Sequence, residues 1–157
     1  DQVAQEVDRT GVSDRAVVVG HSMGAVVAGV ESSRRPVGGL IVCSPSPAGR
    51  EVIALNPIGG AEMQSLVADH AWWIDGRGRS VRDFFGHTRV ARDRRMVLIG
   101  SEEQRYAGAM MTQANIVAGV LGVEAQVVPG GRHHIEDCPV YAEWIVATAT
   151  RIAAQGE

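Results

Sequence analysis

Short apolar runs alternate along this chain with longer segments whose apolar residues recur at helical spacing. The pattern predicts strands at residues 16–19, 40–43, 96–100 and 125–128, and helices at residues 1–10, 23–33, 104–121 and 140–154. The first apolar run, Ala16 to Val19, is typical of a strand buried on both faces. Because strands alternate with helices, we expect an α/β fold with a parallel sheet, whose strands end along one edge.

One segment, residues 48–93, interrupts this alternation. It follows Ser44-Pro45-Ser46-Pro47, where strand pairing ends because proline has no N–H to donate. The segment lacks a strand pattern and contains helical candidates at residues 61–70 and 80–90. We therefore predict a single domain over residues 1–157 with a small helical cap inserted at residues 48–93.

The composition fits a folded globule. The 157 residues are 45% hydrophobic with a net charge of -3, and a chain of this length buries roughly 70% of its unfolded surface. The 15 basic residues, all arginine, are balanced by 18 acidic ones, which gives no strong field for nucleic acid or an anionic membrane. An arginine cluster between residues 77 and 95 is interpreted as a solvated face. The two cysteines, Cys43 and Cys138, give no basis for proposing a disulfide, and a cytoplasmic protein is the default expectation. No run approaches the roughly 18 apolar residues of a membrane span.

The pentapeptide Gly20-His21-Ser22-Met23-Gly24 lies between a predicted strand and a predicted helix. A strand that turns sharply into a helix strains the residue at the turn, and the residues two before and two after it must be small. Gly20 and Gly24 meet this requirement. Ser22 should then project its hydroxyl above the carboxyl edge of the sheet, beside a helix N-terminus that favours negative charge. This arrangement indicates acyl transfer.

The motif in this setting resembles the nucleophile elbow of the α/β-hydrolase superfamily, and the likeness covers nearly all of the chain. Members of the family place several strands, a helix and a loop with an oxyanion donor before the nucleophile, whereas Ser22 has only 21 residues ahead of it. The resemblance therefore implies the C-terminal half of that fold. The first residue, Asp1, is not an initiator methionine, which supports truncation.

The family also carries an acid after a later strand and a histidine after the last one. Gly100-Ser101-Glu102-Glu103 resembles the family segment in which a glycine precedes the acid by three positions, so Glu103 is preferred to Glu102. Glycine-containing loops present the histidine in the family, and Pro129-Gly130-Gly131-Arg132-His133 resembles such a loop. His133 is therefore the expected base, with His134 as its rival.

In the implied mechanism, His133 takes the proton of Ser22 and the alkoxide attacks an acyl carbonyl. The backbone N–H of Met23 then donates to the oxyanion, and water later releases the acid. Four aromatic side chains either line an apolar substrate pocket or form the core of the cap: Trp72, Trp73, Phe84 and Phe85. We predict a serine hydrolase of carboxylic esters or thioesters with a small or medium acyl substrate and no cofactor.

Other functions share these features. A serine at the elbow argues against epoxide hydrolases and haloalkane dehalogenases, which need a carboxylate nucleophile, but carbon-carbon bond hydrolases and cofactor-free haloperoxidases also carry the serine motif. A truncated chain that lacks the second oxyanion donor could be inactive. A homodimer through an exposed sheet edge could restore a pocket between two copies.

Several remaining polar residues have structural interpretations. Five potential metal ligands lie too close together in one loop to surround an ion: His133, His134, Glu136, Asp137 and Cys138. No metal site is therefore expected. Cys43 and Cys138 are interpreted as small buried residues, and the side chain of His21 is expected to point away from the Ser22 hydroxyl.

Overall fold

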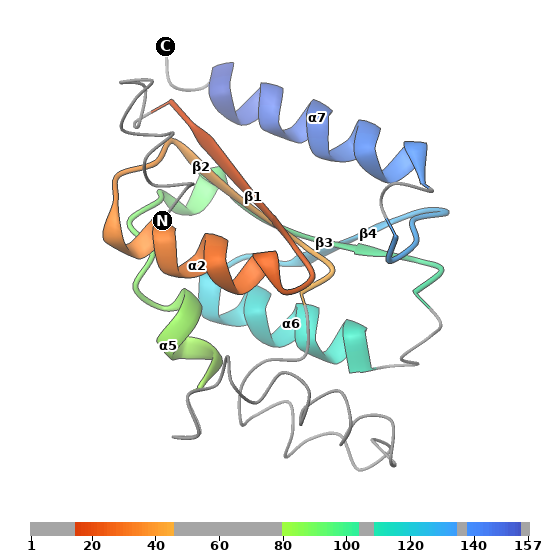
Figure 1. Ribbon diagram of the computed structural model, residues 1–157, viewed down its shortest axis with the longest axis horizontal. Coiled ribbons are helices and arrows are strands. Elements are labelled where there is room, and N and C mark those ends of the chain that lie inside the picture. The colour runs from red at the N-terminus through yellow and green to blue at the C-terminus, as the bar shows by residue number, and fades with distance from the viewer. Residues whose placement is uncertain (1–14, 46–79, 104–108, 135–137, 155–157) are drawn as a thin grey trace.

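Four parallel strands form the centre of the molecule (Figure 1). The computed structural model describes residues 15–45, 80–103, 109–134 and 138–154. The strands are β1 (Val17–His21), β2 (Gly39–Cys43), β3 (Arg95–Gly100) and β4 (Ala125–Val128). Their order in the sheet is their order in the chain, and each neighbouring pair is parallel. The carboxyl ends of the strands therefore lie along one edge, which confirms the predicted α/β architecture.

Helices cover both faces of this sheet (Figure 1). One face carries α2 (Gly24–Arg34), α5 (Val81–Phe85) and α6 (Ala109–Leu121), and the other face carries α7 (Pro139–Ala154). A short 3-10 helix, Arg92–Arg94, leads into β3. Side chains alternate along β2, so that Leu40 and Val42 pack toward α2 and α5 while Ile41 and Cys43 pack toward α7. The two apolar clusters hold the layers together.

Strand β1 is less buried than its unbroken apolar sequence predicts. All five residues of β2 are buried, whereas Gly20 is the buried residue of β1 and Val19 is 42% exposed. Within the described residues, β1 lies at the edge of the sheet and pairs with β2. The prediction that the strand at residues 16–19 is buried on both faces was therefore wrong.

The helix predicted at residues 80–90 is confined to the five residues of α5. Its start is a capping box, in which the Asp83 N–H donates to Ser80 Oγ at 3.2 Å and the Ser80 N–H donates to Asp83 Oδ2 at 2.6 Å. The helix ends at Gly86, whose N–H donates to the Arg82 carbonyl at 2.8 Å. The capping box explains why α5 starts here, and the predicted start at residue 80 agrees with it.

Two aromatic residues of α5 correct part of the predicted cap. Phe84 and Phe85 are 3% and 0% exposed and pack in the apolar cluster beside α2. A Cβ built on Gly29 of α2 would lie 2.6 Å from Phe85 Cδ1, so the glycine makes room for this ring. These phenylalanines are core residues of the main helical layer, which favours the core interpretation over the pocket interpretation. The rest of the predicted cap, with Trp72 and Trp73, lies outside the described residues.

Arg95 departs from the solvated face predicted for the arginine cluster. Its Nε donates to the Val90 carbonyl at 2.7 Å and its Nη1 to the Leu121 carbonyl at 2.8 Å. Leu121 is the last residue of α6, whose final carbonyls have no partner within the helix. Arg95 therefore ties the beginning of β3 to the end of α6. Arg82 and Arg89 are exposed, as the prediction had it.

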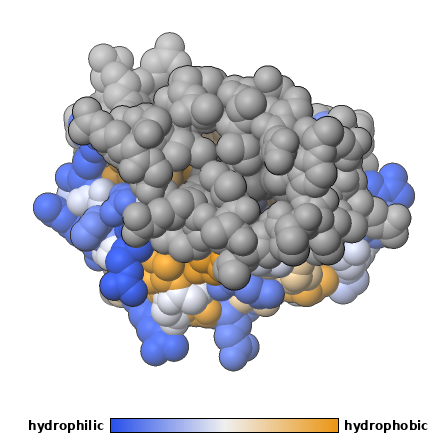
Figure 2. Space-filling model, turned by 90° about the horizontal axis from the view of Figure 1, so that it is seen from below, coloured by the Kyte–Doolittle hydropathy of each residue, from blue (hydrophilic) through white to orange (hydrophobic). Residues whose placement is uncertain are grey.

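The described surface is mixed in character. Figure 2 views the molecule from below and shows hydrophobic residues interspersed with hydrophilic ones where the described part is visible. None of the described helices is both long and apolar enough to cross a bilayer.

Candidate active site

Ser22 occupies a sharp turn between β1 and α2. Its φ of 52° lies in the left-handed region, which residues with a side chain rarely adopt. The Ser22 N–H donates to the Cys43 carbonyl at 3.0 Å, and the Ser22 carbonyl accepts from the Ala25 N–H at 3.1 Å. The first bond continues the pairing of β1 with β2 and the second begins the helix. The predicted strand, turn and helix are therefore present at Ser22.

Met23 follows at the N-cap of α2 and is 37% exposed. The first N–H groups of a helix have no carbonyl acceptor within it, and the helix dipole adds partial positive charge there. The backbone at Met23 is thus suited to an anion that forms beside Ser22.

The two glycines of the pentapeptide are not equivalent. A Cβ on Gly20 would lie 2.6 Å from Ala25 Cα and 2.6 Å from Ala28 Cβ, so the strand packs directly against α2 there. A Cβ on Gly24 would meet nothing within 4 Å. The steric requirement predicted for both positions therefore applies to Gly20 and was wrong for Gly24.

The structure separates the two adjacent glutamates. The side chain of Glu103 is 3% exposed, and its Oε2 lies 3.2 Å from His133 Nδ1. Glu102 turns outward, where its Oε2 accepts from Arg132 Nε at 2.9 Å and both side chains are exposed. Glu103, the residue preferred from the sequence, is the one that contacts the histidine.

Close contact of two loop backbones brings this pair together. A Cβ on Gly100 would collide with the Gly131 carbonyl, and a Cβ on Gly131 would lie 2.8 Å from Gly100 Cα. The Glu102 N–H donates to the Gly131 carbonyl at 2.9 Å, and the Ser101 N–H donates to the Val128 carbonyl at 3.0 Å. Glycines at positions 100 and 131 allow the loop after β3 to lie on the loop after β4.

The ring of His133 packs beside the ring of His21, the residue that directly precedes Ser22 in the chain. The ring centroids of His21 and His133 are 5.0 Å apart, and that of exposed His134 lies 5.8 Å from His133 in an edge-on arrangement. His21 therefore takes part in the packing around the candidate base, a role that the sequence did not reveal. Because Nδ1 of His133 faces Glu103, the tautomer with its proton on Nδ1 leaves Nε2 as the proton acceptor.

The environment of Glu103 favours its ionised form. Burial alone would raise its pKa. Hydrogen bonds from His133, from the Ser44 hydroxyl and from the Gly100 N–H, together with the charge of His133, outweigh burial and lower the pKa below its ordinary value of 4.5. The carboxylate is thus a hydrogen-bond acceptor at neutral pH.

This lowered pKa has a consequence for stability. The ionised carboxyl stabilises the folded state above pH 4.5, and its contribution is lost as the pH falls through the lower folded value. Glutamine does not titrate, so the stability advantage of the native protein over Glu103→Gln should be largest near neutral pH and shrink below pH 4.5. Urea unfolding of both proteins at several pH values measures it. An advantage that grows on acidification contradicts the assigned environment.

Two residues beside Glu103 were missed by the sequence reasoning. Ser44 follows β2 with a φ of 43°, and its hydroxyl contacts Glu103 Oε1. The same hydroxyl lies 2.8 Å from the hydroxyl of Tyr141, a fully buried residue of α7. The position of Ser44 at the carboxyl end of a strand was the available signal, because such ends meet at one edge.

The cysteines have the buried, structural positions predicted for them. Cys43 is 0% exposed and Cys138 is 5% exposed, and both thiols are free. Burial, followed by the charge of Glu103, raises the pKa of Cys43 to about 12, so its thiol stays protonated. Within the described ranges, no group of three His, Cys, Asp or Glu side chains could hold a metal ion.

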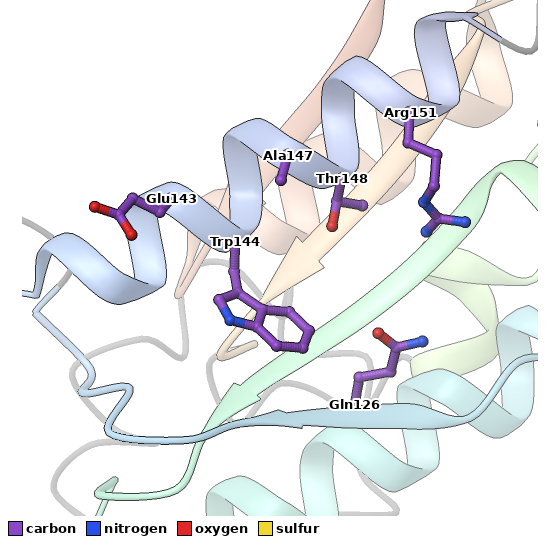
Figure 3. A pocket seen from close by; sticks show the side chains of 6 residues that line it. All are labelled: Gln126, Glu143, Trp144, Ala147, Thr148 and Arg151. Carbon is purple, nitrogen blue, oxygen red and sulfur yellow. The ribbon is translucent and has the colours of Figure 1, made fainter.

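A cavity of about 430 Å³ lies between α7 and β4 (Figure 3). In Figure 3, Trp144, Thr148 and Arg151 extend from α7 toward the sheet, and Gln126 extends from β4 toward them. Its lining includes neither Ser22 nor the Glu103–His133 pair. This cavity is therefore separate from the candidate active site.

The similarity to known proteins lies in the fold. No protein-family model matches this sequence, and no curated protein is similar to it in sequence. The crystal structure of VinJ is similar with a TM-score of 0.60 and 17% identity, over 96% of this chain and 71% of VinJ. A hormone-sensitive lipase from a metagenome library has a TM-score of 0.50 and 19% identity, over 96% of this chain and 55% of the lipase. Both neighbours have the α/β-hydrolase fold.

Proposed function

We propose that this chain, which has the α/β-hydrolase fold predicted from its sequence, carries the nucleophile, base and acid of a serine hydrolase. The observation that carries the proposal is the contact between buried Glu103 and His133, 3.2 Å apart, at the sheet edge where the strained Ser22 turn lies. His21, which directly precedes Ser22, packs on the His133 ring.

The proposed reaction is acyl transfer in two steps. His133 Nε2 removes the proton of Ser22 Oγ, and the oxygen attacks the acyl carbonyl while Glu103 stabilises the protonated ring. The Met23 N–H donates to the oxyanion, and the protonated histidine then returns a proton to the departing alcohol or thiol. Water attacks the acyl-enzyme in the same way and releases the acid, which restores Ser22.

The proposed substrates are carboxylic esters or thioesters with a small or medium acyl group. This chain spans 71% of VinJ and 55% of the lipase, so the activity of a whole protein of this kind is part of the proposal. Carbon-carbon bond hydrolysis and haloperoxidation remain alternatives with the same nucleophile. The fold does not choose among these reactions.

A fluorophosphonate probe tests the proposal without knowledge of the substrate, because it phosphonylates an activated serine. We expect the label on the peptide that contains Ser22, and its loss in Ser22→Ala. Ser33→Ala, which changes a serine near the end of α2 whose hydroxyl donates to the Val30 carbonyl, should keep the label. Mass spectrometry of the digested protein locates the modification. A chain that circular dichroism shows to be folded, and that takes no label at Ser22, contradicts the proposal.

A further inference from the structure

A chain of three side chains links helix α7 to the candidate acid. Tyr141 of α7 and Ser44 at the end of β2 have their hydroxyl oxygens 2.8 Å apart, and the Ser44 hydroxyl contacts Glu103 Oε1. Ser44 and Tyr141 are both 0% exposed. Residues from three separate segments of the sequence therefore form one chain of direct hydrogen bonds.

The ionised carboxylate gives this line a direction. A carboxylate oxygen can accept but not donate, so Ser44 must donate its proton to Glu103 Oε1. The Ser44 oxygen is then left as an acceptor, and the Tyr141 hydroxyl is the donor that faces it. Burial raises the pKa of Tyr141 above its ordinary value, so the tyrosine keeps its proton. Aligned donors of this kind polarise one another.

The two oxygens of Glu103 consequently have different partners. Oε1 accepts from Ser44 and from the Gly100 N–H at 3.1 Å, while Oε2 is left for His133 Nδ1 at 3.2 Å. Two donors on one oxygen prevent rotation of the carboxylate about its terminal bond. The neighbouring Cys43 thiol is protonated and brings no competing charge.

We propose that Ser44 and Tyr141 are positioning residues, a hydroxyl relay that keeps Glu103 ionised and turned toward His133. They act through Glu103 and touch no substrate. The relay rests on the proposed function for its effect on catalysis, but its effect on Glu103 stands on the hydrogen bonds alone. It also makes the site depend on the docking of α7, because Tyr141 reaches the sheet from that helix.

The first test measures the titration of the Glu103 carboxyl by carbon NMR of glutamate-labelled protein, with Glu103→Gln to assign the signal. Ser44→Ala should raise the pKa of Glu103, because a donor to the ionised form is lost, and Tyr141→Phe should raise it by less. Alanine retains the Cβ at a φ of 43°, so the backbone strain is unchanged. Ser32→Ala is the matched control, since buried Ser32 donates to Gly29 within α2 and should leave the titration unaltered.

The second test measures the rate of fluorophosphonate labelling at Ser22. Hydrogen bonds to charged groups predict a loss of about tenfold for Ser44→Ala and about threefold for Tyr141→Phe, with no change for Ser32→Ala. If Ser44→Ala does not fold, Tyr141→Phe alone tests the relay, because phenylalanine retains the buried ring and removes only the hydroxyl. An unchanged Glu103 titration in a folded variant overturns the relay. Absence of labelling in the native protein contradicts the proposed hydrolase, and the titration still decides the relay.

Discussion

Replacement of Glu103 by glutamine should slow the labelling of Ser22 by a fluorophosphonate about 10³ to 10⁴-fold. Ser44 and the Gly100 N–H both donate to Oε1, so they should hold the amide oxygen of the glutamine in that place. The amide NH₂ then faces His133 Nδ1, which must accept instead of donate. The ring is forced to carry its proton on Nε2, and it can no longer remove the proton of Ser22.

The adjacent glutamate provides the control for this experiment. Glu102 forms an exposed pair with Arg132, and such surface pairs contribute little. Glu102→Gln should therefore change the labelling rate by less than about twofold. Second-order rate constants for the two variants and the native protein, measured at one pH, decide the assignment. Similar losses in both variants, or a larger loss in Glu102→Gln, would show that Glu103 is not the orienting acid.

Replacement of Gly20 by alanine should reduce the free energy of unfolding by about 3 kcal/mol, as expected for a group forced into a packed interior. The new Cβ would lie 2.6 Å from Ala25 Cα, which is a backbone atom and cannot move aside as a flexible side chain can. The cost arises because β1 and α2 would have to separate at the elbow. Labelling at Ser22 should fall as well, since its turn depends on this contact.

Gly24→Ala is the matched variant from the same pentapeptide. Its Cβ meets nothing within 4 Å, and alanine favours a helix over glycine by up to about 1 kcal/mol. We therefore expect unchanged or slightly increased stability, although both glycines belong to one motif. Urea unfolding followed by circular dichroism compares the two. Equal destabilisation by both substitutions would contradict the packing at the elbow.

The sequence was sufficient for the order of elements and for the positions where chemistry could sit. Apolar periodicity predicted the strands, and the resemblance of the elbow to α/β-hydrolases predicted a fold that the solved structures confirm. Ser22, Glu103 and His133 each follow a predicted strand, in the order in which the family carries its nucleophile, acid and histidine. These features depend on residues that are close together in the chain, so that a sequence pattern is enough to predict them.

The predictions that needed distant contacts were less complete. Phe84 and Phe85 could equally line a pocket or fill a core, and the packing of α5 against α2 made them core residues. The roles of Ser44 and Tyr141 depend on a contact between residues 97 positions apart in the chain, and no sequence motif links the two. Burial of a side chain is decided by the element packed on it, and that element is seldom its neighbour in sequence.

The sequence by itself determined an alternating parallel sheet with a serine at a strand-to-helix turn, because strand and helix periods and the elbow are local properties of the chain. Only the tertiary structure decided that Glu103 and not Glu102 meets His133. The side chains of these adjacent glutamates have the same chemistry but point in opposite directions. Their directions depend on the close approach of Gly100, the last residue of β3, to Gly131 in the loop after β4. That approach, and the hydroxyl relay behind it, exists only where the sheet brings the ends of its strands together.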